Sequence, residues 1–304
     1  MVICASDLRP LHAGGIDPLV RAAGDAGATG IHLAGGVFLG DFEAVIPAVL
    51  RAGLLAPSMA LPLAPRKLAA GKRLPALAAA ATDERGAAIA LATEGLEAGV
   101  AAGVRFAWLD FGPVSLPVAR GEVAASFARR ELDADAGDLA LALAARKAFA
   151  ERLADACRWS VERLVRIAEA RSVTLVLPVG ASPWEAPSAR EALALHEAFR
   201  GAPVGLAWDP GRLTAARALG LRLPDARVAA VAAAAVAARE TDAVGLDAGY
   251  LPGLGERDEA LPARPELPRN APVVVAGRAD ATDAEIARAV ASVTARYEAQ
   301  SPSP

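Results

Sequence analysis

The chain has 304 residues, of which 54% are hydrophobic and 22% charged, and its formal net charge is −3. This length can bury one large core or two ordinary ones, and the charge balance argues against nucleic acid or an anionic membrane surface as a partner. The first ten residues, MVICASDLRP, lack the basic and apolar regions of a signal peptide. We therefore expect a cytoplasmic protein without a membrane segment, and the sequence leaves its oligomeric state open.

Eight short apolar runs recur along the chain, each followed by turn residues and then by a stretch with helical character. They cover residues 2–6, 29–35, 53–61, 104–112, 173–180, 204–211, 243–249 and 271–278. Strands that alternate with helices indicate parallel strands joined by crossovers, and eight such units fit a parallel (β/α)8 TIM barrel. A doubly wound open sheet is the alternative, but no glycine-rich phosphate loop follows the first run. The sequence predicts one barrel domain over residues 1–298 and a disordered tail over 299–304.

The segments between these runs differ in regularity. Residues 146–171 carry an apolar face at steps of three or four, with Cys157 on it, and predict a helix packed on the core. The alanine-rich stretch 228–238 also predicts a helix, because alanine is the best helix former. Residues 112–145 form a long mixed segment. Residues 248–272 contain five prolines, so the seventh helix of the barrel is expected to be shortened or replaced by an irregular loop.

Polar residues gather where the predicted strands end, and active sites of such barrels lie at that end. Side chains alternate between the barrel interior and the helix layer. If the large apolar residues face the helices, His32, Asp209 and Asp247 point into the mouth, and we predict them as the catalytic residues. Other strand-end side chains are predicted to bind the substrate: Arg9, Asp110, Arg212, Tyr250 and Arg278.

Simpler structural roles compete with these predictions. His32 could be a core histidine with a satisfied hydrogen bond, and Asp209 could cap the following helix, since aspartate is a preferred N-cap. The arginines could be surface partners of nearby acids. Trp184 and Glu185, in the stretch SPWEAP, fit a surface turn better than a loop lining the mouth.

Two common chemistries are disfavoured by the residues at the strand ends. The chain has only three lysines, Lys67, Lys72 and Lys147, and none ends a predicted strand, so a Schiff-base aldolase is not expected. The nucleophile elbow G-x-S-x-G of serine hydrolases is also missing from the sequence. Cys4 and Cys157 are too far apart to suggest a metal site or a disulfide framework.

Four stretches of the sequence resemble the xylose isomerase-like barrels, a superfamily of sugar isomerases, sugar-phosphate epimerases and related endonucleases. They are GIHLAGGVF (30–38), VTLVLPVGASP (173–183), VGLAWDPGRL (204–213) and LPGLGERDEAL (251–261). The resemblance extends over most of the chain. It implies a barrel that binds a divalent metal with carboxylates and histidines from several strands, and that moves protons during isomerisation or epimerisation.

Most of the metal ligands implied by this resemblance are replaced. The glutamates implied for the second, fifth and eighth strands fall on or near His32, Pro178 and Ala276. The aspartate of the sixth strand falls on Asp209, and the histidine after it falls on Arg212. The histidine of the seventh strand falls near Gly245. Only the aspartate is retained. A hard divalent cation needs several anionic oxygens, and an arginine beside the aspartate would repel it. We therefore predict no cofactor.

Three functions remain open. In each of them the protein binds a small molecule or another protein. The first, which we favour, is a divergent metal-independent enzyme of the isomerase or epimerase type, acting on a small anionic or polyol substrate that its arginines hold. The second is a non-catalytic descendant that binds a ligand or a partner protein, with residues 248–272 as a contact surface. The third is a metalloenzyme whose relocated ligands would be His32, Asp110, Asp209 and Asp247.

Overall fold

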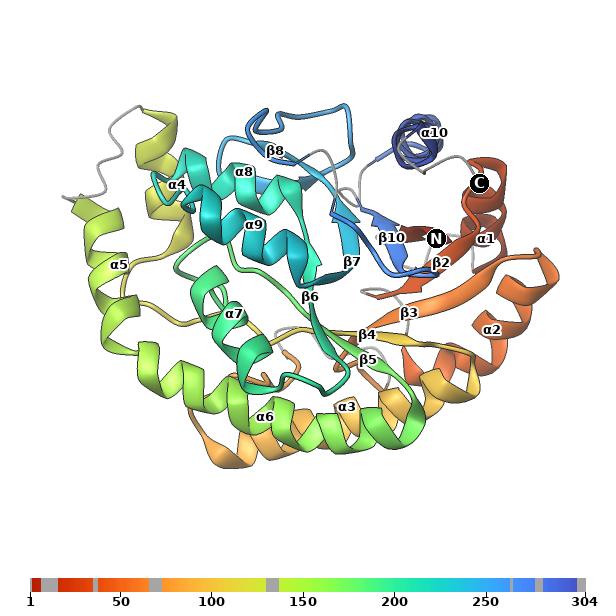
Figure 1. Cartoon of the computed structure of the whole chain (residues 1–304), viewed down its shortest axis with the longest axis horizontal. Coiled ribbons are helices and arrows are strands. Elements are labelled where there is room, and N and C mark those ends of the chain that lie inside the picture. The colour runs from red at the N-terminus through yellow and green to blue at the C-terminus, as the bar shows by residue number, and fades with distance from the viewer. Residues whose placement is uncertain are drawn as a thin grey trace.

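The fold, taken from a computed structural model, is a closed barrel of eight parallel strands (Figure 1), which confirms the predicted TIM barrel. The structure describes residues 2–6, 16–34, 38–65, 73–129, 137–262, 265–276 and 281–299. Around the barrel the strands follow the order β1, β10, β7, β6, β5, β4, β3, β2. Their bounds are β1 Val2–Ser6, β2 Gly30–Leu33, β3 Leu55–Leu61, β4 Phe106–Leu109, β5 Thr174–Leu177, β6 Val204–Trp208, β7 Ala235–Glu240 and β10 Pro272–Val275.

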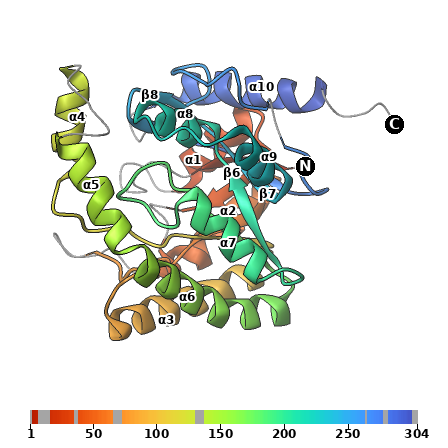
Figure 2. The ribbon, with the colours of Figure 1, turned by 60° about the vertical axis from the view of Figure 1, so that its left-hand side comes forward.

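Helices form the layer outside the strands. They are α1 Ile16–Asp25, α2 Phe42–Arg51, α3 Thr82–Ala101, α6 Ala150–Arg171, α7 Ala189–Ala198, α8 Pro210–Ala218, α9 Asp225–Ala233 and α10 Asp283–Ala299, with a short 3₁₀ turn η2 at Leu39–Asp41. The long α3 and α6 run side by side, and the additional helices α4 (Arg120–Ala128) and α5 (Gly137–Ala148) stand beside the barrel (Figures 1 and 2). None of the described helices is long and apolar enough to cross a lipid bilayer.

Side chains alternate along the strands as the sequence pattern predicts. The large residues Ile31, Leu33, Leu206 and Trp208 belong to the core between strands and helices. The barrel interior holds a separate and smaller cluster, made of Val2, Cys4, Trp108, Val176, Ala207, Ala237, Val274 and Ala276. Cys4 and Cys157 are both buried in packing positions. At the carboxyl ends of the strands, the residues whose side chains point into the barrel therefore face its mouth.

One predicted strand is wrong. Residues 243–249 lie mostly in an antiparallel hairpin of β8 (Asp242–Val244) and β9 (Asp247–Tyr250), which packs against α8 (Figure 1). The seventh barrel strand is β7, inside and just after the alanine-rich stretch that predicts helix. These residues form a strand and not a helix because they pack tightly against the neighbouring strand β6. A Cβ on Gly205 of β6 would lie 2.3 Å from Val236. Close strand packing and sheet hydrogen bonds here override the helix propensity of alanine.

The expected loss of the seventh helix is confirmed within the described part of the chain, where no helix lies between β7 and β10. The outward side chain at the end of β7 is Glu240, which is fully buried. Its carboxylate accepts hydrogen bonds from Arg257 (2.8 Å), Arg296 (2.7 Å) and the Tyr297 hydroxyl (2.8 Å). A charged network that includes α10 thus stabilises the side of β7 that a regular barrel would cover with a helix.

The segment after β7 crosses closely over the start of α8. A Cβ on Gly211 would lie 2.2 Å from the Thr241 hydroxyl and 2.8 Å from the Asp242 carbonyl oxygen. We expect Gly211→Ala to lower the free energy of unfolding by about 1–3 kcal/mol, because a backbone carbonyl cannot move aside cheaply. Urea unfolding measures this. Gly86→Ala on α3 is the control, since its Cβ meets nothing within 4 Å, and it is expected to stabilise by up to about 1 kcal/mol.

Candidate functional site

A cavity of about 790 Å³, the mouth cavity, opens at the carboxyl ends of the barrel strands. Its floor comes from β2, β3, β4, β7 and β10 and from the residue after β5; the side chains are His32, Ala60, Trp108, Arg239, Val274 and Pro178. Residues 112–116, 118–120 and 184–186 form its walls. The cavity therefore lies at the end of the barrel where the strand ends predict a site.

Positive charge dominates the lining of the mouth cavity. The described lining residues include the arginines Arg73, Arg120, Arg212 and Arg239, against the two carboxylates of Asp110 and Glu185. Two indole rings, from Trp108 and Trp184, add flat apolar surface. Such a lining favours a ligand that carries negative charge and also has a nonpolar face.

Arg239 is the most unusual of these residues. It has the same inward phase as Ala237 on β7 and pairs in register with Val274 of β10. Within the described residues its guanidinium makes no hydrogen bond and no ion pair. Burial is the main cause that lowers the pKa of Arg239, while the charge of Asp209 opposes it and that of Arg212 adds to it. A partly buried guanidinium that lines a cavity and has unused donors is the arrangement that an anion would satisfy.

Asp209 takes the alternative role that the sequence left open, that of a helix cap. Its Oδ1 accepts hydrogen bonds from the Arg212 backbone N–H (3.1 Å) and from the Thr241 hydroxyl (2.7 Å). Its Oδ2 lies 3.5 Å from Nε of the Arg212 side chain. The carboxylate is buried and is not among the lining residues of the mouth cavity. It fixes the start of α8 and orients Arg212, which does reach the cavity.

Glu185 lines the mouth cavity, whereas a surface turn away from the mouth was expected at SPWEAP; a turn does form at residues 183–184, but it belongs to the cavity wall. Its Oε2 accepts hydrogen bonds from the backbone N–H groups of Ala181 (2.7 Å) and Ser182 (3.0 Å), and its Oε1 lies 3.7 Å from Arg212. Burial raises the pKa of Glu185, but the charge of Arg212 and the amide donors outweigh it, so the pKa is lowered overall. This carboxylate is ionised at neutral pH and holds the loop after β5.

His32 enters the mouth cavity as a neutral ring. Its Nδ1 lies 2.9 Å from the Ser58 hydroxyl, and the ring packs edge-to-face on Trp108 with centroids 5.6 Å apart. Burial, and then the charge of Arg239, lower the pKa of His32 to about 3. At neutral pH the imidazole therefore carries no charge and offers a hydrogen bond rather than a proton.

The buried His32 predicts a pH dependence of stability. Since its pKa is about 3 in the folded protein and about 6.5 when unfolded, the unfolded chain binds the extra proton between these values. Stability must therefore fall as the pH drops below about 6.5, by about 2 kcal/mol between pH 7 and pH 5. Urea unfolding of the natural protein and of His32→Gln tests this: the variant should lose less stability over the same interval. Parallel curves for the two proteins would contradict the assignment.

Asp247 and Tyr250 do not lie at the end of a barrel strand, and this part of the prediction is wrong. Both belong to β9 of the hairpin and are not among the residues that line the mouth cavity. Asp247 pairs with Arg120 at 3.1 Å, with both side chains largely exposed. Asp110 does line the cavity and accepts a hydrogen bond from the Gly112 N–H (2.9 Å).

Two predicted substrate-binding residues, Arg9 and Arg278, fall outside the described residues. Arg239 is not among the residues predicted from the sequence, because it lies next to the stretch that predicts helix. The signal was present in Ala237 and Arg239, which lie two residues apart and therefore share one face of a strand. With β7 placed there, the inward residue at the end of the seventh strand is Arg239 and not Gly245.

The donor set does not fit the divalent metal that the resemblance implies. No group of three or more histidine, cysteine, aspartate or glutamate side chains that could hold a metal ion occurs in the described ranges. The carboxylate of Asp209 is already used by Thr241 and by α8. The guanidiniums of Arg212 and Arg239 line the same cavity, and their charge opposes the entry of a cation.

At the level of sequence, the chain matches no protein-family model and no curated protein. Solved structures match it at high probability. They include D-allulose 3-epimerase from Methylomonas sp. in complex with D-allulose (13% identity, TM-score 0.67, 98% of this chain and 97% of that one). A 3-keto-D-glucoside 4-epimerase from E. coli (12%, TM-score 0.65, 97% and 99%) and a putative xylose isomerase from Rhodospirillum rubrum (16%, TM-score 0.62, 99% and 100%) are also similar. The chain thus has the barrel fold of sugar epimerases and xylose isomerase-like proteins.

Proposed function

We propose that the mouth cavity binds a small anionic polyol, such as a sugar acid or a sugar phosphate, through guanidinium groups and without a divalent metal. The observation that carries this proposal is Arg239, a partly buried cation that lines the cavity together with Arg212 and has no hydrogen-bond partner among the described residues. A carboxylate or phosphate at this point would satisfy its donors.

The rest of the lining supports a sugar-like body for this ligand. The indoles of Trp108 and Trp184 offer flat surfaces for the C–H face of a sugar or polyol. Asp110 and Glu185 offer acceptors for hydroxyl groups, and the neutral ring of His32 offers one further hydrogen bond. Epimerases of similar fold act on sugars according to their names, which favours the same class of compound here.

Binding is better supported than turnover. A general acid or base works best when its pKa is near the working pH, whereas the pKa of His32 is about 3 and that of Glu185 is lowered. The second candidate function is an epimerase-like or isomerase-like proton transfer, in which the ionised Glu185 would be the base. This candidate is favoured by the barrel fold that the protein shares with sugar epimerases.

A ligand panel tests the proposal in the presence of a chelator such as EDTA. Sugar acids and sugar phosphates should raise the melting temperature and bind in calorimetry, whereas neutral ketoses such as D-allulose should bind at least tenfold more weakly. If the protein transfers a proton, a bound sugar should exchange a hydrogen for deuterium in D2O, and NMR would detect this exchange. The proposal fails if no anionic polyol binds, or if binding appears only after a divalent metal is added.

A further inference from the structure

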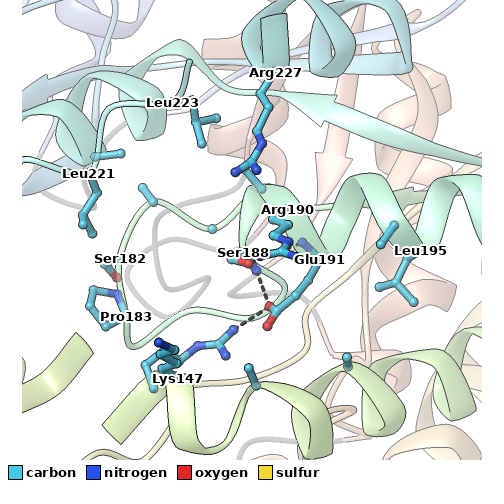
Figure 3. Close-up of a pocket in the computed structure, with 18 of the residues that line it drawn as sticks. Lys147, Ser182, Pro183, Ser188, Arg190, Glu191, Leu195, Leu221, Leu223 and Arg227 are labelled. Atoms are coloured by element: carbon cyan, nitrogen blue, oxygen red, sulfur yellow. Dashed lines mark hydrogen bonds and ion pairs between the residues drawn. The ribbon is translucent and has the colours of Figure 1, made fainter. Parts of the chain in front are cut away.

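A second cavity, the side pocket, lies outside the barrel. It has a volume of about 660 Å³ and is lined by α6, the end of α5, α7, residues 180–183 and the α8–α9 region (Figure 3). Lys147 stands on one side of it, and Leu221, Leu223 and Arg227 stand on the other (Figure 3). No role in the mouth cavity accounts for this pocket, although residues 180–186 contribute to both.

The side pocket combines an apolar wall with charged groups. Its apolar side chains come mainly from α7, α8 and the residues after α8: Leu195, Leu213, Ala216, Leu221 and Leu223. This volume and this mixture are typical of sites for small organic ligands, which are mostly apolar with a few polar groups that fix orientation.

Arg146, at the end of α5, is a buried cation in the lining of the side pocket. Only 8% of its surface is exposed. Its Nη2 donates a hydrogen bond to Oε2 of Glu191, and the described residues provide no other acceptor for its five N–H donors. Glu191 is itself engaged, because the same oxygen accepts the Ser188 N–H (2.8 Å) that begins α7. The guanidinium therefore has spare donors at the pocket and is already fixed in orientation.

The charges around Arg146 favour an anionic ligand. Lys147, Arg158, Arg190 and Arg227 line the side pocket, and within the described chain none of them has an ion-pair partner. Glu151 and Asp155 line it too and offset two of these four cations. The balance that remains is positive and favours an anionic group, and the apolar wall favours an anion that carries an apolar body, such as a carboxylate.

We infer that the side pocket is a binding site for a small amphiphilic carboxylate, whose apolar body packs on the leucine wall and whose carboxylate meets Arg146. This site is independent of the function proposed for the mouth cavity. Octanoate is a suitable probe. Acetate supplies the charge without the apolar body, and octan-1-ol supplies the body without the charge.

Calorimetry with these three probes tests the chemistry of the side pocket. Octanoate should bind at least tenfold more tightly than either acetate or octan-1-ol. Octanol binding as tightly as octanoate would remove the role of Arg146 and overturn the inference. The inference would also be overturned if octanoate did not bind at any concentration below the range in which it forms micelles.

Variants place the probe in the pocket. Ala194 lies on α7 in the pocket lining, and Ala198 lies on the same helix outside it; both are exposed. Ala194→Trp should weaken octanoate binding at least tenfold by filling the pocket, and Ala198→Trp should leave it unchanged. Equal effects of the two substitutions, or none, would place octanoate elsewhere and overturn the inference.

A charge-neutral double variant tests Arg146 without leaving a buried carboxylate unpaired. Arg146→Met with Glu191→Gln removes both charges, and glutamine still serves the capping position at the start of α7. Octanoate binding should fall at least tenfold while octan-1-ol binding stays the same, and unchanged octanoate binding would contradict the inference. The variant Arg239→Met, in the mouth cavity, should bind octanoate normally, which separates this result from the fate of the sugar-acid proposal.

Discussion

Replacing Glu240 by alanine is expected to destabilise the barrel by about 3–5 kcal/mol. The carboxylate is fully buried, and it accepts hydrogen bonds from Arg257, Arg296 and the hydroxyl of Tyr297. Without it, the largely buried guanidiniums of Arg257 and Arg296 and the hydroxyl of Tyr297 each lose a direct hydrogen-bond acceptor.

Urea unfolding at neutral pH measures this effect as a shift of the midpoint. Glu197→Ala is the matched control, because Glu197 forms an ion pair with Arg200 on the surface, with side chains 63% and 77% exposed. Exposed pairs of this kind contribute about 0–1 kcal/mol. If the two substitutions shift the midpoint equally, the Glu240 network does not stabilise the fold as argued.

Arg239→Met is expected to abolish most of the binding of anionic polyols, with an affinity loss of about 30-fold or more, since removing a buried charged partner costs about 2 kcal/mol or more. The same substitution should stabilise the unliganded protein. It replaces a partly buried guanidinium that has no ion-pair partner among the described residues, and whose pKa is lowered by burial, with an apolar side chain of similar length. Affinity and stability should therefore change in opposite directions.

Calorimetry with the best ligand of the panel and thermal unfolding without ligand measure the two effects of Arg239→Met. Arg105→Met is the control, because Arg105 precedes β4 at the opposite end of the barrel, is exposed, and does not line the mouth cavity. It should change neither quantity appreciably. Binding that survives Arg239→Met, with stability unchanged, would show that the anion site lies elsewhere.

Much of the barrel could be predicted from local pattern. His32 could be placed in the mouth because Ile31 and Leu33 are large and belong in the helix layer, and the same reasoning gave Asp209 its inward phase after Trp208. The seventh strand could not be predicted, because Ala235, Ala237 and Ala238 are favourable in a helix. Their strand state depends on narrow packing between β6 and β10, which involves residues distant in sequence.

The roles of the acids depended on contacts that no local pattern reveals. Asp209 is held by Thr241, 32 residues further along the chain, so its inward phase did not make it a cavity residue. Glu185 looked like part of a solvated turn, yet Ala181, Ser182 and Arg212 draw it into the wall of the mouth cavity. Asp247 was misplaced with its strand. In each case the type of side chain could be read from the sequence, but its interaction partner depended on the three-dimensional fold.

The segment 180–186 separates the two cavities, with its first residues lining the side pocket and its last residues lining the mouth cavity. Glu185 binds the amides of Ala181 and Ser182 and also approaches Arg212, so this carboxylate joins both surfaces. A molecule that displaced the segment from one side would alter the other side. If one occupant changes the affinity for the other in this way, thermodynamic reciprocity requires the second to change the affinity for the first by the same factor.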